Sequence, residues 1–138
     1  MSRISLKLKT IRVVEKQSGD GAQLELRIQA TDGVHSGVWP ALDQLAKVDN
    51  GGSIQPVDVT LGTYSVNAGS LSKRVDITLV EKDGGFGGKD DHGSGSTTFE
   101  LTPNMSVVSR KVLISLKRPD IKKTLGKVEI EVCAQPER

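Results

Sequence analysis

The sequence has little cysteine and few aromatic residues. Cys133 is the single cysteine among 138 residues, and aromatics make up 3%. One cysteine excludes an internal disulfide and any cysteine-rich zinc site. With so few aromatics, the core has to be built mainly from aliphatic side chains.

Long apolar runs are also absent. No segment has the roughly 20 apolar residues that a membrane-spanning helix needs, and residues 1–20 contain no signal-peptide core. As written, the chain is expected to stay in the cytoplasm. A leader removed from the chain and export without a leader both stay open as alternatives.

A strong charge of one sign is missing as well. Nineteen basic and seventeen acidic residues leave a formal net charge of +2, which gives no argument for a nucleic-acid partner. Basic residues gather in the last third of the chain, but no base-stacking aromatics lie among them, so nucleic acid is not expected. These basic residues are expected to cover a solvated sheet face, and the alternative is that they attract an anionic membrane surface.

Hydrophobic residues make up 36%, so residues 1–138 are expected to form a single globular domain.

The dominant pattern is alternation of apolar and polar residues with period two. Leu24, Leu26, Ile28 and Ala30 share one face of a predicted strand. The same alternation recurs in segments centred on Val59, Ile77, Phe99, Ile114 and Ile130. The sequence therefore predicts an all-β fold, an antiparallel β-sandwich of about eight strands.

Two local irregularities stand out in this pattern. The apolar phase changes between Leu8 and Ile11, which predicts a β-bulge near Thr10. Ala41–Val48 is the one segment expected to form a short helical turn.

Cys133 shares a face with Glu129 and Glu131 near the end of the chain, so its thiol is expected to be partly accessible.

A glycine-rich segment between two predicted strands carries the strongest functional pattern. Six glycines between residues 84 and 95 would let Asp83 approach Asp90 and Asp91. Carboxylates about 4 Å apart repel by up to about 4 kcal/mol at an effective dielectric near 20. A cation removes this repulsion, and calcium suits irregular sites built from oxygen ligands. The alternative is that these residues belong to ordinary solvated turns.

A second acidic loop follows the first predicted strand. If it lies at the same end of the sandwich, Glu15 and Asp20 would complete a carboxylate cage with the later aspartates. Calcium is therefore the one cofactor that the sequence predicts. A Ser-His-Asp set could be chosen from the many serines, but the sequence has no strand-turn-helix nucleophile elbow and no zinc triad, so an enzyme is not expected.

These residues resemble the C2 domain family. The resemblance rests on the two acidic loops, on the strand over residues 75–83 that ends in acidic residues, and on Asp-Asp-His-Gly at residues 90–93. Segments 111–117 and 126–132 extend it to the last two strands. It implies an eight-stranded β-sandwich whose end loops bind calcium and often phospholipid or protein.

The resemblance also assigns roles to single residues. Asp83 would match the first aspartate of the family's Asp-x-Asp pair, and Asp90 or Asp91 a later one. Gly85 stands where the second aspartate of the pair is expected, and Asp20 falls near the ligand position of the first loop. The resemblance therefore implies a weak or single-ion site.

Phe86 lies between glycine pairs in the middle of the long loop. In the resembled family, apolar residues at loop tips enter the membrane interface, so Phe86 is a candidate contact with a membrane or a partner. The alternative is that it folds back over the end of the sandwich.

Two functions follow from the sequence. The first is a C2-like binding module that docks on phospholipid or a protein partner through its end loops, with calcium. The second is a structural or assembly subunit, a homo-oligomer of β-sandwiches with no functional metal site.

Overall fold

A computed structural model describes residues 2–16, 22–41, 43–82, 90–118 and 126–137, and this described part contains nine strands and no helix. The strands are β1 (Ser2–Glu15), β2 (Gln23–Thr31), β3 (Ser36–Trp39), β4 (Ala46–Asp49), β5 (Gln55–Val66), β6 (Leu71–Glu81), β7 (Asp91–Leu101), β8 (Val108–Leu116) and β9 (Gly126–Glu137). The predicted all-β fold is confirmed. No helix able to cross a membrane occurs in these ranges.

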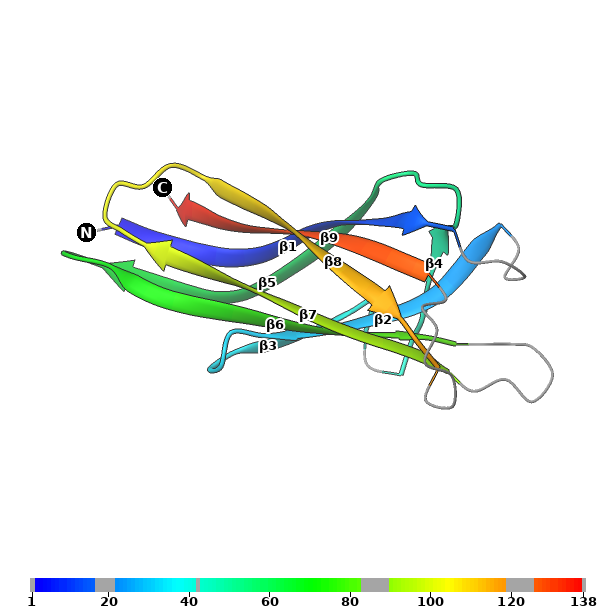
Figure 1. Ribbon diagram of the computed structural model, residues 1–138. Helices are drawn as coiled ribbons and strands as arrows, with labels where there is room; N and C mark the ends of the chain where they lie inside the picture. The colour runs from blue at the N-terminus through cyan, green and yellow to red at the C-terminus, as the bar shows by residue number, and fades with distance from the viewer. Residues whose placement is uncertain (1, 17–21, 42, 83–89, 119–125, 138) are drawn as a thin grey trace.

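The strands form two antiparallel sheets that pack face to face (Figure 1). The first sheet has the order β5-β1-β9-β8, and the second has the order β3-β2-β6-β7. Strand β4 also pairs with β2, along the part of β2 that β3 leaves free. At one point the two sheets meet, because His92 of β7 and Lys117, which follows β8, form a β-bridge.

The alternating apolar residues of both sheets fill one core between them. Leu26 and Ile28 of β2, Ile77 of β6 and Ile130 of β9 are at most 1% exposed. Phe99 is the largest of the fully buried side chains. Burying one of these apolar side chains contributes roughly 1.5–3 kcal/mol. A shift of one residue would expose the whole apolar face of a strand, so this burial fixes the pairing register.

The predicted bulge in β1 is confirmed. The register of β1 shifts between Leu8 and Thr10 against both of its neighbours, β5 and β9. The extra residue restores the inward phase, so that Ile11 and Val13 return to the core.

The predicted helical turn over Ala41–Val48 is wrong. Residues 46–49 instead form β4, in which Val48 pairs with Leu24 and is fully buried. An eight-residue helix is unstable without packing, whereas a short strand completes the hydrogen bonds of β2 and buries Val48.

The predicted exposure of Cys133 is also wrong, because its side chain is fully buried. Cys133 lies in a central strand and pairs with Lys7 of β1 on one side and Ser109 of β8 on the other. Long side chains on a sheet face cover what lies between them. Burial raises the pKa of the Cys133 thiol.

Candidate functional site

The strands bring the two predicted acidic segments to the same end of the sandwich. Strand β1 ends at Glu15, beside Lys127 at the start of β9. Strand β7 begins at Asp91. The bridge between His92 and Lys117 ties the start of β7 to the end of β8, which in turn pairs with the start of β9. We call this end, to the right in Figure 1, the loop end.

Three of the predicted site residues are described by the structure. Glu15 is exposed, and its Oε2 lies 3.6 Å from Nζ of Lys127. Asp90 is exposed, whereas Asp91 is 3% exposed. Asp20, Asp83 and Phe86 lie outside the described residues.

Asp91 was predicted as a loop residue, but it is the first residue of β7. It pairs in register with Glu81, the last residue of β6, which is 2% exposed. Glu81 was missed as a candidate residue, although the sequence held a signal. It continues the inward phase of Ile77 and Leu79, so a carboxylate stands at a core position.

The loop end therefore concentrates negative charge near the core. Glu81 and Asp91 both have interaction partners. Like charges directly opposite each other in a sheet are destabilising. Because both side chains have partners, this pair does not by itself indicate a bound cation. Within the ranges that the structure describes, no three His, Cys, Asp or Glu side chains are close enough to hold a metal ion.

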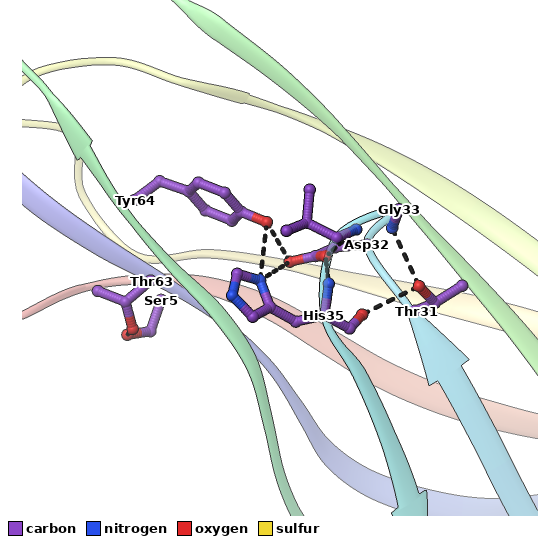
Figure 2. A network of polar contacts seen from close by, with 8 residues as sticks. Ser5, Thr31, Asp32, Gly33, His35, Thr63 and Tyr64 are labelled. Atoms are coloured by element: carbon purple, nitrogen blue, oxygen red, sulfur yellow. Dashed lines mark hydrogen bonds and ion pairs between the residues drawn. The ribbon is translucent and has the colours of Figure 1, made fainter.

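A second polar cluster lies toward the opposite end, at the turn between β2 and β3 (Figure 2). Asp32 accepts hydrogen bonds from the backbone N–H groups of Val34 (3.0 Å) and His35 (2.6 Å). Its other oxygen accepts one from the hydroxyl of Tyr64 on β5. Nδ1 of His35 lies 3.3 Å from the same hydroxyl. The cluster thus links the two sheets.

The cluster changes the proton affinity of its members. Although burial acts to raise the pKa of Asp32, hydrogen bonds from Tyr64 and the turn backbone hold it below its usual value. Burial and the neighbouring carboxylate raise the pKa of Tyr64 to about 12. Gly62 makes room for this arrangement, because a Cβ there would collide with the polar atoms of Asp32, His35 and Tyr64.

Neither His35 nor Tyr64 was predicted from the sequence as a candidate site residue. The Asp-Gly pair at residues 32–33 marked a turn. Nothing in the sequence indicated that a tyrosine 32 residues away would reach it.

Comparisons with known proteins give a limited result. No protein-family model matches the sequence, and no curated protein matches it. Among solved structures, the chain is similar to a C2 domain of plant extended synaptotagmin 1, with a TM-score of 0.44 and 14% sequence identity. The similarity covers 99% of this chain and 96% of that chain. That domain belongs to the family that the sequence resembles.

Proposed function

We propose that this protein is a non-enzymatic binding module whose loop end docks on a phospholipid surface or a protein partner, and that calcium strengthens the docking. The observation that carries the proposal is the placement of acidic residues from separate strands at one end. Glu15 is the last residue of β1, Asp91 is the first residue of β7 at that same end, and Asp90 directly precedes it.

Calcium is the cation that fits this chemistry best. It accepts carboxylate and main-chain oxygens in irregular geometry. The nearby Lys127 competes for Glu15 through their ion pair, and an exposed pair of this kind contributes only about 0–1 kcal/mol. The proposed site is therefore weak, and Glu15 can exchange Lys127 for an ion at little cost.

Exposed apolar side chains near the loop end support docking on a membrane or a partner. Val14, next to Glu15, is 46% exposed. Ile54, which precedes β5, is 68% exposed, and β5 begins opposite Ile11 of β1. Burying one such side chain in a membrane interface contributes roughly 1.5–3 kcal/mol.

A melting experiment tests the calcium proposal. At a calcium concentration about 100 times its dissociation constant, the free energy of unfolding should rise by about 2.7 kcal/mol. The double variant Asp83→Asn with Asp90→Asn should abolish this rise. Asp76→Asn is the matched control, because Asp76 is half exposed on the outer face of β6 and pairs with Arg74. An unchanged melting temperature in millimolar calcium would contradict the proposal.

Vesicle flotation separates the two partners. With phosphatidylserine vesicles, flotation that disappears on adding a chelator supports lipid docking. A calcium-dependent melting shift without flotation favours a protein partner. No response to calcium, together with large particles in light scattering, favours the alternative function, an assembly subunit without a functional metal site.

A further inference from the structure

A recess on the outer surface lies where β6, β7 and β8 meet. It has a volume of about 540 Å³. Six side chains that line it matter for its chemistry: Thr78, His92, Ser94, Leu113, Ser115 and Lys117.

The recess exists because β7 and β8 approach closely at Gly93. A Cβ at this glycine would lie 2.5 Å from both Ile114 Cγ2 and the carbonyl oxygen of Ser115. Two backbone hydrogen bonds follow from this approach, from His92 N to Lys117 O (2.8 Å) and from Lys117 N to His92 O (2.9 Å). They bring His92 and Lys117 side by side, although 25 positions separate them in the sequence.

The polar side chains of the recess carry hydrogen-bond donors, although the hydroxyl of Thr78 already donates to the carbonyl oxygen of Gln29 (3.4 Å). Thr78 and Ser94 form a register pair across β6 and β7, both exposed, and Ser115 adds a third hydroxyl from the neighbouring sheet. His92 supplies an imidazole and Lys117 an ammonium group. No carboxylate belongs to the described lining of the recess.

Lys111 of β8 and Lys117, which directly follows β8, lie on the same face of this edge, but they differ in whether a carboxylate neutralises the ammonium group. The ammonium of Lys111 lies 3.9 Å from Oε1 of Glu129. Lys117 is exposed, and its ammonium forms no ion pair with any residue in the described part of the chain. Among the residues that the structure describes, none therefore neutralises the positive charge of Lys117 in the recess.

We propose that this recess binds a phosphate monoester. The hydroxyls of Ser94 and Ser115, an imidazole and an ammonium group offer more donors than the two oxygens of a carboxylate can use, whereas a phosphate monoester has three terminal oxygens. Lysine is a common phosphate-binding residue because of its compact charge. Leu113, 53% exposed at the edge, provides an apolar contact for the organic part of the ester.

The recess lies on the outer face of the sandwich and needs no metal ion, so this proposal is independent of calcium binding at the loop end. All experiments that test it contain a chelator. A failure of the calcium proposal would leave it intact, and its own failure would leave calcium docking intact.

Titration with glycerol 3-phosphate, followed by backbone amide chemical shifts, tests the proposal directly. We expect saturable shifts centred on residues 92–94 and 115–117. Lys117→Met should weaken the affinity about tenfold, the usual effect of losing one charge-assisted contact. Lys111→Met should leave it unchanged. His92→Gln, also at an exposed position, serves as a second variant that should retain the fold.

Two results would overturn the proposal. The first is an equal pattern of shifts with sodium chloride of matched ionic strength. The second is an affinity that does not change in either Lys117→Met or His92→Gln.

Vesicles then identify the source of the monoester. Flotation with phosphatidic acid, which carries a monoester, but not with phosphatidylglycerol, a diester, would assign a lipid headgroup. Binding of glycerol 3-phosphate without flotation would assign a soluble ligand. Equal flotation with both lipids that persists in Lys117→Met would show attraction by general charge and contradict a monoester site.

Discussion

Asp32 shows how a single carboxylate can be kept charged inside this fold. Its side chain is fully buried. Burying an ionised group is costly unless hydrogen bonds replace its hydration. The backbone of the β2–β3 turn and the hydroxyl of Tyr64 provide these bonds. The result is a fixed connection between a turn of one sheet and a strand of the other.

Tyr64→Phe should therefore destabilise the protein. The variant keeps the aromatic ring beside Lys73 but leaves one oxygen of a buried carboxylate without its donor. The expected loss in the free energy of unfolding is about 1–3 kcal/mol, measured by urea denaturation at pH 7. A loss below about 0.5 kcal/mol would show that water or His35 replaces the hydroxyl.

The same residues predict how stability depends on pH. The pKa of Asp32 is lower in the folded chain than its ordinary value of 3.8. Its contribution is therefore present above pH 3.8 and is lost as the pH falls through the folded pKa. The pKa of Tyr64 is raised from 10.0 to about 12, so its contribution is lost as the pH rises from 10 toward 12. In Tyr64→Phe the alkaline loss should disappear and the acid loss should shrink. Denaturation series from pH 5 down to about pH 2 and from pH 10 to pH 12 measure both effects.

At the scale of elements, the sheet edges need protection. Strand β8 is an edge of its sheet and pairs only with β9, apart from the bridge at Lys117. Its first half carries two exposed basic residues, Arg110 and Lys111. Lysine and arginine on an exposed edge oppose pairing with a second chain. We therefore expect Arg110 and Lys111 to protect this edge from pairing with a second chain.

Removing this protection should cause self-association. Arg110→Val with Lys111→Val joins these positions to Val107, Val108 and Val112 in a strongly β-forming segment. We expect large particles in light scattering at concentrations where the parent chain scatters weakly. Lys7→Val with Arg12→Val is the control, because it removes the same charge from the central strand β1. Equal scattering by both double variants would attribute the effect to net charge instead of the edge.

The period-two pattern was sufficient to predict most elements, because one face of each strand is buried in a common core. It failed where a segment is short or where its burial depends on neighbours. Residues 46–49 became a strand through pairing with β2, and β7 began at Asp91, before its alternating apolar residues. Cys133 was buried by side chains of adjacent strands that the sequence of β9 does not reveal.

Candidate sites were predictable only as far as topology allows. Strand direction was enough to indicate that the segments after Glu15 and before Asp91 could share an end. Contacts between Asp32 and Tyr64, or between His92 and Lys117, depend on how the two sheets pack. Sheet packing is set by the whole core, so no local pattern in the sequence reports it.

At the scale of the molecule, both sheets depend on one core and should unfold together. Trp39, the single tryptophan, is partly buried and packs against this core from the second sheet. Its fluorescence should therefore follow the same denaturation curve as far-UV circular dichroism, which reports the strands of both sheets. Separate midpoints would contradict a single cooperative unit.

The burial of Cys133 has a practical consequence for measuring the oligomeric state of the protein. We do not expect two folded copies to join through a disulfide, because the single thiol of each chain is fully buried. A covalent dimer on a non-reducing gel would therefore come from chains that had already opened. Any oligomer of native copies must instead be held by noncovalent contacts.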